Sequence, residues 1–218
     1  MSIDLGAAYR ASRERITTLV ERADETAVVP ATPGWNVHDV IAHLAGIVED
    51  ARTGNMAGAT TDPWTAAQVE RGRDKPLAQL LGEWTDGAAG IEGFLSSPAG
   101  QSAYRAVFDI HTHEADLANA LRARAALPAS VIEWAAGQLM AGFHEAATAA
   151  GLPAVEVGAT PFEVFRGRLG RRTEAEICGY DWSADPLPYL DTWFVFGRRS
   201  KSLDESTPSP DAPTAEVR

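Results

Sequence analysis

The sequence predicts a mainly α-helical protein, an up-and-down bundle of four long helices with a small α/β appendage on its C-terminal side. Long segments repeat apolar residues at spacings of three and four, the pattern of amphipathic helices. Clusters of proline and glycine separate these segments and give each helix a start and a stop. After Gly151 the periodic segments become short, which indicates a second kind of structure.

The composition is that of a globular, cytoplasmic protein. Of 218 residues, 45% are hydrophobic and 22% charged, and 19 basic against 30 acidic residues give a net charge of −11. This acidity argues against nucleic acid as a partner, because binding phosphates needs clusters of basic residues. No signal peptide and no membrane span are expected. The single cysteine, Cys178, excludes an internal disulfide framework and a zinc ribbon.

The first two helices are predicted from their apolar spacing and their ends. Residues 4–25 form an amphipathic pattern that the proline- and glycine-containing stretch 28–34 interrupts. The next helix begins at Asn36, an N-cap residue, and Asp39 completes an approximate capping box. This helix is expected to end near 54–58.

Three further helices follow. Residues 59–75 are expected to be a connector with a short helical turn at 64–70. Pro76 starts a helix that ends at 96–100. The last two long helices are predicted at the following ranges: 102–124 and 128–150.

The C-terminal part is predicted to be a short appendage. It contains a strand at 154–157, a helix at 161–169 and a helix start where Thr173 and Glu176 have capping-box spacing. The aromatic stretch 189–197 is expected to pack on the bundle. The resulting division is a bundle at 1–151, an appendage at 152–199 and a disordered, Ser- and Pro-rich tail at 200–218.

The predicted helix at 102–124 carries a candidate pair of metal ligands. At about 100° per residue, Asp109 and His113 lie roughly 40° apart on one face. His111 lies about 200° from each and therefore points the other way. A carboxylate and an imidazole at i,i+4 need one more ligand to make an open catalytic metal site.

His43 has two interpretations. It lies in the apolar stripe of its helix, where a histidine must find a partner or lose solvation. Taken alone, it is better explained as a hydrogen-bonded core histidine. Considered together with Asp109 and His113, it is favoured as the third ligand.

The sequence resembles the mycothiol-dependent maleylpyruvate isomerase family, within the DinB-like four-helix bundles. The matching motifs run in order along the chain up to about residue 197. They are Trp35–Gly46, Trp64–Val69, Leu80–Trp84, His113–Leu117, Phe162–Arg166 and Gly170–Thr173. Their order and spacing are specific for the family and less specific for one reaction.

The resemblance implies a divalent metal, most often zinc, bound by His43, Asp109 and His113. The family has glutamate at the position of Asp109. Aspartate is also a zinc ligand but is one methylene shorter, so the metal is expected closer to this helix or more weakly bound.

The resemblance also implies an enzyme that uses mycothiol as a cosubstrate. Coordination to the metal lowers the pKa of the thiol, and the thiolate adds to a small electrophile. The outcome is either cis–trans isomerisation or S-transfer. Two alternatives stay open: a zinc-dependent hydrolase, and a non-catalytic DinB-like protein that binds a metal or ligand in stress responses.

Three further residues are candidates for catalysis. Asp116, one turn beyond His113, is expected either to orient an imidazole or to make a structural hydrogen bond. Asp116 is also the candidate general base of a hydrolase. Arg171 and Arg172 are candidates for binding a carboxylate of the substrate, and the alternative for both is a solvated surface position.

Overall fold

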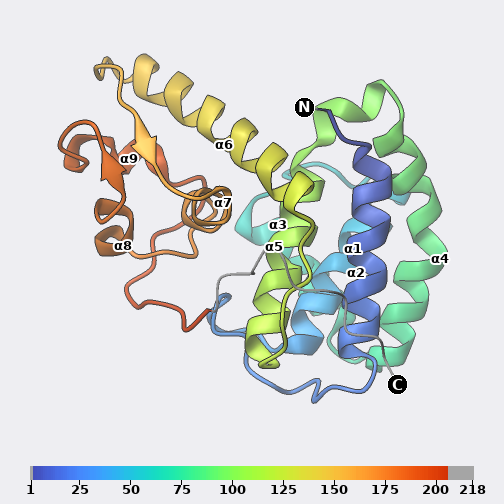
Figure 1. Ribbon diagram of the computed structural model, residues 1–218. Helices are drawn as coiled ribbons and strands as arrows, with labels where there is room; N and C mark the ends of the chain where they lie inside the picture. The colour runs from blue at the N-terminus through green and yellow to red at the C-terminus, as the bar shows by residue number, and fades with distance from the viewer. Residues whose placement is uncertain (1, 206–218) are drawn as a thin grey trace. The chain divides into compact units, whose positions relative to one another are not determined.

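The computed structural model describes residues 2–205, which form two compact units, Ser2–Ala125 and the residues from Ala126 onward. Figure 1 shows a mainly helical chain, as the sequence predicts, with very little strand. Each unit is described by itself below. The predicted disordered tail lies outside the described residues from Ser206 on.

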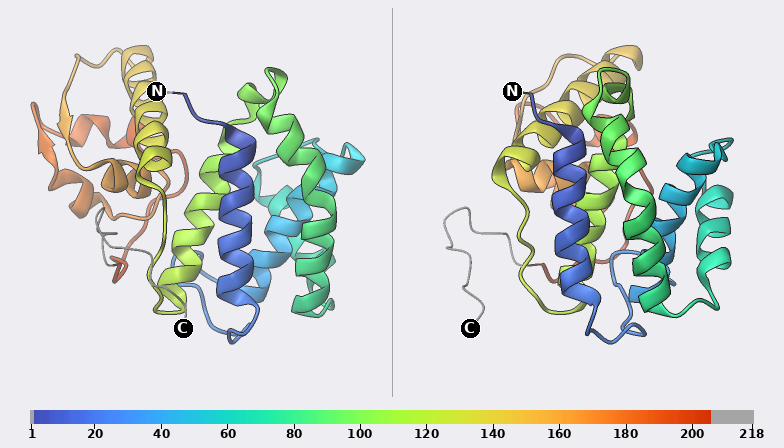
Figure 2. Two further views of the ribbon diagram at one scale, coloured as in Figure 1. Left: turned by 45° about the vertical axis from the view of Figure 1, so that its right-hand side comes forward. Right: turned by 90° about the vertical axis from the view of Figure 1, so that its right-hand side faces the viewer.

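The N-terminal unit is a helical bundle. Its elements are α1 (Leu5–Val20), α2 (Val37–Thr53), α3 (Asp62–Gly72), α4 (Leu77–Ser96), the 3₁₀ helix η1 (Ala99–Ala103) and α5 (Arg105–Ala120). Helix α1 packs against α4 and α5, and α2 packs against α4 and, less extensively, α5, so four helices form a closed ring. The right-hand view of Figure 2 shows α1 beside α4.

Helix α3 decides the directions of the bundle helices. The sequence predicts only a short turn here, but α3 spans eleven residues and packs along α2. It returns the chain to the end of the bundle where α2 begins. There the His38 ring nitrogen Nε2 lies 2.7 Å from the carbonyl oxygen of Lys75, just before α4. Helices α2 and α4 therefore run in the same direction, and α3 is the connection that permits it.

The start of α2 is fixed by the predicted capping box. The Asn36 side chain accepts a hydrogen bond from the Asp39 backbone N–H, and the Asp39 carboxylate accepts one from the Asn36 backbone N–H. The helix ends at Gly54, which has a left-handed φ of 76°. Since both ends are set by local sequence, the phase of α2, and with it the direction of His43, is well defined.

A glycine allows α3 to lie close to α2. A Cβ atom on Gly46 would lie 2.6 Å from Cβ and 2.8 Å from Cγ of Gln68. Atoms at those distances overlap, so only glycine fits here. The close approach inserts Gln68, which is 1% exposed, between the two helices.

The C-terminal unit is built from short elements around one long helix. These are α6 (Ala129–Ala149), β1 (Val157–Gly158), α7 (Pro161–Arg168), α8 (Glu174–Cys178), β2 (Asp181–Trp182), η2 (Leu187–Tyr189) and α9 (Leu190–Trp193). The two strands pair antiparallel, with Val157 opposite Trp182. The predicted capping box of Thr173 and Glu176 starts α8.

Helix α6 belongs to this unit. It packs against α7 and α9, and Phe143 and Ala147 join the core cluster formed with Val155, Ile177 and Trp193. The boundary between the compact units thus falls at residues 125–126, whereas the sequence analysis draws its boundary after Gly151. Apolar periodicity identifies a helix, but it does not show which partner its apolar face covers.

Within the described residues, no helix is long and apolar enough to cross a membrane.

Candidate metal centre

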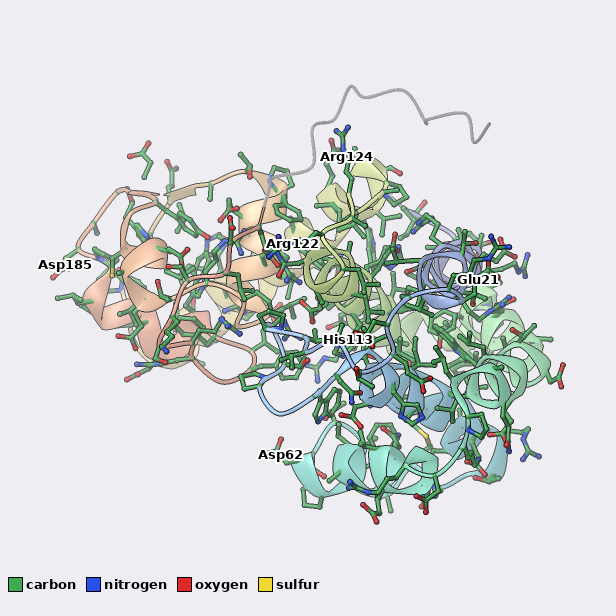
Figure 3. All side chains as sticks on the ribbon, turned by 90° about the horizontal axis from the view of Figure 1, so that it is seen from below. Glu21, Asp62, His113, Arg122, Arg124 and Asp185 are labelled. Atoms are coloured by element: carbon green, nitrogen blue, oxygen red, sulfur yellow. The ribbon has the colours of Figure 1, made fainter. Side chains whose placement is uncertain are left out.

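Three side chains from two helices converge at one point of the N-terminal unit. Asp109 and His113 face the same way on α5, with 3.6 Å between Asp109 Oδ1 and His113 Nε2. His43 on α2 brings its Nε2 to 3.5 Å from Asp109 Oδ2. One potential ligand atom from each residue lies within 4.8 Å of the others. Figure 3 labels His113 among the side chains of this unit.

These distances fit a divalent metal. Ligand atoms about 2.1 Å from a tetrahedral zinc ion lie about 3.4 Å from one another. Each imidazole nitrogen lies close to that edge length from one carboxylate oxygen, His43 Nε2 at 3.5 Å from Oδ2 and His113 Nε2 at 3.6 Å from Oδ1. Two imidazoles and one carboxylate are a common ligand set of catalytic zinc, and they leave a coordination position for a further ligand.

Gln68 sets the orientation and tautomer of His43. The Gln68 amide donates from Nε2 to Asp50 Oδ2 at 2.8 Å, so its Oε1 is the atom that faces His43 Nδ1, also at 2.8 Å. An amide oxygen only accepts, and Nδ1 of His43 must therefore carry the proton. The other ring nitrogen, Nε2, then offers a lone pair toward Asp109, as a metal ligand requires.

Asp116 lies behind the second imidazole. Its carboxylate is 0% exposed, and Oδ2 is 3.3 Å from Nδ1 of His113. The geometry of this contact is not yet that of a hydrogen bond, because Nδ1 of His113 lacks a hydrogen-bond partner among the described residues.

Trp35 covers the two imidazoles from the segment before α2. Its ring centroid lies 5.3 Å from that of His43 and 6.2 Å from that of His113, the latter with the planes 25° apart. Its position against both histidines fits a wall.

Tyr9 of α1 brings a neutral phenol close to the carboxylate of the centre. Burial raises the pKa of Tyr9, and the charge of Asp109 raises it further. Its hydroxyl oxygen accepts a 3.4 Å hydrogen bond from Trp84 Nε1. Asp109 itself is the accessible member of the centre, with 31% of its side chain exposed against 6% for His43 and 7% for His113.

His111 points away from this centre, as the helical phase predicts. It is 1% exposed, and its Nδ1 lies 2.9 Å from the carbonyl oxygen of Val107. Burial lowers the pKa of His111, so the ring stays neutral.

Arg171 and Arg172 lie in the C-terminal unit, and the solvated surface positions considered for them are wrong. They are 9% and 6% exposed. Arg171 donates to the carbonyl oxygen of Leu169 at 2.7 Å. Arg172 donates to both oxygens of Glu163, at 2.7 and 2.8 Å, and to Glu205 at 2.7 Å. Arg172 therefore already binds carboxylates of its own chain.

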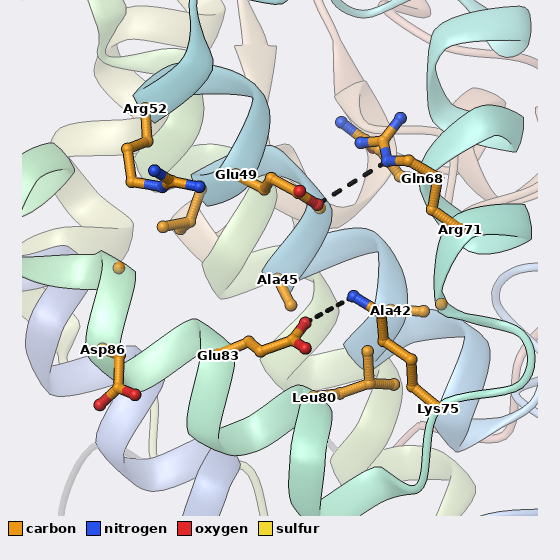
Figure 4. Close-up of a pocket in the computed structure, with 14 residues that line it drawn as sticks. Ala42, Ala45, Glu49, Arg52, Gln68, Arg71, Lys75, Leu80, Glu83 and Asp86 are labelled. Atoms are coloured by element: carbon orange, nitrogen blue, oxygen red, sulfur yellow. Dashed lines mark hydrogen bonds and ion pairs between the residues drawn. The ribbon is translucent and has the colours of Figure 1, made fainter.

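A cavity of about 400 Å³ lies between α2, α3 and α4, and Gln68 is among its lining residues. Figure 4 shows charged groups of both signs around it, including the ion pairs Arg71–Glu49 at 3.8 Å and Lys75–Glu83 at 2.7 Å. These charges already neutralise one another, and no candidate ligand of the metal lines this cavity.

Gln68 was not predicted as part of the site. Gln68 lies in the Trp64–Val69 motif of the sequence. Its hydrogen bond to His43 depends on α3 being long enough to lie along α2. A buried glutamine on the apolar face of a helix is the signal that could have identified it, since such an amide needs partners.

A comparison with known protein families identifies the family of this chain. The family described as mycothiol maleylpyruvate isomerase N-terminal domain matches residues 7–174, which include all three candidate ligands. No curated protein and no solved structure matches the chain. Since the match spans most of the sequence, the chain belongs to the mycothiol maleylpyruvate isomerase N-terminal domain family.

Proposed function

We propose that this protein is a metal- and mycothiol-dependent isomerase or thiol S-transferase acting on a small electrophile. The observation that carries the proposal is the convergence of His43, Asp109 and His113 within 4.8 Å, in a chain of the mycothiol maleylpyruvate isomerase family. We further propose zinc as the metal, because two imidazoles and a carboxylate suit it.

A divalent metal bound here would lower the pKa of a coordinated thiol, so that a thiolate exists at neutral pH. Mycothiol would supply the sulfur nucleophile, which adds to an activated double bond and either leaves again after rotation or stays attached. The first outcome is isomerisation, and the second is S-transfer.

The residues of the chain hold this arrangement in place. Gln68 keeps the lone pair of His43 Nε2 directed at the centre. Asp116, buried 3.3 Å from Nδ1 of His113, would accept a hydrogen bond from that nitrogen when a metal holds Nε2. Trp35 lies against both rings and shields them from water, while the exposed part of Asp109 marks the side where a thiol would enter.

The electrophile is proposed to carry a carboxylate. Arg171 and Arg172, the candidates from the sequence, already donate to the carbonyl oxygen of Leu169 and to Glu163 and Glu205, so neither is assigned to the substrate.

A hydrolase is less well supported. Its general base would be Asp116, but that carboxylate is fully buried beside Nδ1 of His113, the ring nitrogen that faces away from Asp109. A general base must reach the water that it activates.

The test is a thermal-unfolding experiment with purified, metal-loaded protein. We expect mycothiol to raise the unfolding temperature and a chelator to abolish that rise. The variant His43→Ala should lose both the metal and the response to mycothiol.

The matched control is His144→Ala, which removes an exposed histidine on α6. It should retain the metal and the response. If the chelator leaves the mycothiol-induced rise in unfolding temperature unchanged, the thiol is not bound through a metal. If His43→Ala keeps both the metal and the response to mycothiol, the assignment of His43 as a ligand is wrong.

A further inference from the structure

Arg168, the last residue of α7, is a buried cation without an acidic partner. It is 4% exposed. Burial alone lowers the pKa of Arg168, to about 10, and no charged group among residues 2–205 acts on it in the opposite direction. A guanidinium group still keeps its proton at neutral pH, so the chain holds this positive charge in its interior unpaired.

The hydrogen bonds of Arg168 use one corner of its guanidinium group. Nη1 donates to the carbonyl oxygen of Thr192 at 2.7 Å and also to that of Trp193. The Cζ atom lies 5.5 Å from the ring centroid of Phe143 and 5.6 Å from that of Trp193. Carbonyl groups and aromatic rings attract a cation but carry no net charge. These contacts therefore fix the group in place without neutralising it.

The other edge of the guanidinium group, formed by Nε and Nη2, is free. Nε is buried and has no hydrogen-bond partner, and Nη2 donates no hydrogen bond within the part of the chain that the structure describes. The N–H groups on this edge are parallel, and their spacing matches the two oxygens of a carboxylate.

Two other arginines show what this edge binds when it is occupied. Arg15 donates from Nε and Nη2 to the two oxygens of Glu114, at 2.7 and 2.8 Å. Arg172 does the same to Glu163, at the same two distances. Arg168 presents the same edge, but no described residue supplies the acid.

A glycine on α6 leaves space beside this edge. A Cβ atom on Gly142 would lie 3.9 Å from Nη2 of Arg168. Apart from its own helix backbone and its chain neighbours, no other described atom lies within 4 Å of that position. Gly142 itself is half-buried rather than buried. A small ligand can therefore approach Nη2 from this side.

We propose that Arg168 binds the carboxylate of a small ligand, which occupies the Nε–Nη2 edge from the side of Gly142. The carboxylate receives both hydrogen bonds and neutralises the buried charge. A singly charged carboxylate is favoured over phosphate, because burying a doubly charged ion beside Phe143 and Trp193 costs more. The inference stands apart from the metal and thiol chemistry, because neither enters its argument or its test.

The first test observes the Nε–H group of Arg168 in the wild-type protein by proton–nitrogen NMR, with acetate as the probe. Acetate should move this proton signal downfield until the site is saturated, because the group gains a charged acceptor. The Nε–H group of Arg172 already donates to Glu163 and serves as the internal comparison. An Arg168 signal that stays in place, or that moves only together with the Arg172 signal, would overturn the proposal.

Inorganic phosphate tests the choice of ligand in the same measurement. At the same ionic strength, it should move the Arg168 signal less than acetate does. A larger movement with phosphate would contradict a site for carboxylates.

Thermal unfolding gives a second readout. We expect the unfolding temperature to rise by about 2–4 °C, and then to level off, in sodium acetate compared with sodium chloride of the same ionic strength. Arg168→Lys keeps the positive charge but lacks the two-donor edge, so it should lose this rise. The control Arg198→Lys changes an exposed arginine of the same unit and should keep it. An equal rise in both variants would show that acetate acts without this site.

Two glycines of α6 test the direction of approach. Gly142→Val fills the space beside Nη2, and we expect it to weaken acetate binding several-fold in the NMR titration. Gly137→Val makes the same change on the same helix, where a Cβ meets nothing within 4 Å, and should leave acetate binding unchanged. Equal acetate affinities in the two variants would contradict binding from the side of Gly142.

Discussion

At the scale of single residues, His43 owes its orientation to a hydrogen bond with Gln68, and Asp116 lies beside His113 without one. Gln68 and Asp116 each face the Nδ1 atom of one histidine and leave its Nε2 for the metal. Such supporting contacts fix the tautomer and the ring orientation of a metal ligand. In the sequence, spacing indicates Asp109 and His113 as candidate ligands, and the family resemblance adds His43. The supporting residues can be identified only once the helices are placed.

Replacing Gln68 by leucine tests this support. We expect Gln68→Leu to weaken metal binding about 10- to 100-fold, because Nδ1 of His43 loses its acceptor and the ring its fixed orientation. Competition with a chromophoric chelator measures the affinity. The control is Gln79→Leu, an exposed glutamine on α4 that pairs with Glu83. Equal affinities in the two variants would show that Gln68 does not orient His43.

Asp50 makes the same network sensitive to acid. Burial alone would raise its pKa, but hydrogen bonds from Gln68, Asn55 and Arg71 lower the pKa below the ordinary 3.8. A carboxylate whose pKa is lowered by folding stabilises the protein above the pKa of the unfolded chain. That stabilisation is lost as the pH falls through the lower, folded-state value.

The variant Asp50→Asn should therefore be less stable than the wild type at neutral pH. The difference in the free energy of unfolding should shrink as the pH falls below about 3.8. Urea unfolding at a series of pH values measures it. A difference that is constant across this range would mean that the charge of Asp50 does not stabilise the fold.

At the scale of elements, the close packing of α3 on α2 brings Gln68 within hydrogen-bond distance of His43. The sequence predicts α2 well, because Asn36 and Asp39 form the capping box that fixes its start. It predicts the i,i+4 pair of Asp109 and His113 for the same reason, since helical phase is a local property.

Features that depend on contacts between distant segments are not predicted. The length of α3 is underestimated because tertiary packing against α2 stabilises residues whose own pattern is weakly helical. Glu205 falls in a stretch whose composition predicts disorder, yet its side chain is buried by two arginines about 35 residues earlier in the chain.

Gly46→Ala tests the packing of α3 on α2. The added Cβ would overlap Gln68 at 2.6 Å, and we expect a loss of about 1–3 kcal/mol in the free energy of unfolding together with weaker metal binding. The matched control is Gly90→Ala on α4, where the Cβ meets nothing within 4 Å. That change should stabilise the helix by about 0.5–1 kcal/mol. Similar effects of both substitutions, measured by urea unfolding, would contradict the tight contact.

At the scale of the whole molecule, the chain forms two compact units with different contents. The bundle at Ser2–Ala125 contains the candidate metal ligands, and the unit from Ala126 on contains the ion pairs of Arg166 and Arg172 with Glu205. A ligand that binds only the folded state stabilises it, by about 2.7 kcal/mol at a concentration one hundred times its dissociation constant.

Removal of the metal should therefore destabilise the bundle. In hydrogen exchange, we expect a chelator to speed the exchange of amides in α2 and α5, which contribute the three ligands. The core of the C-terminal unit around Phe143 and Trp193 serves as the internal comparison. Unchanged exchange in α2 and α5 would mean that these helices bind no metal.

The most direct test of the central claim is X-ray absorption spectroscopy of the zinc-loaded protein. We expect two imidazole nitrogens and one carboxylate oxygen at about 2.0–2.2 Å, with a further light-atom ligand in the remaining position. His43→Ala should remove one imidazole from this shell. A zinc shell without imidazole, or one that His43→Ala leaves unchanged, would contradict the assignment of His43, Asp109 and His113 as the metal centre.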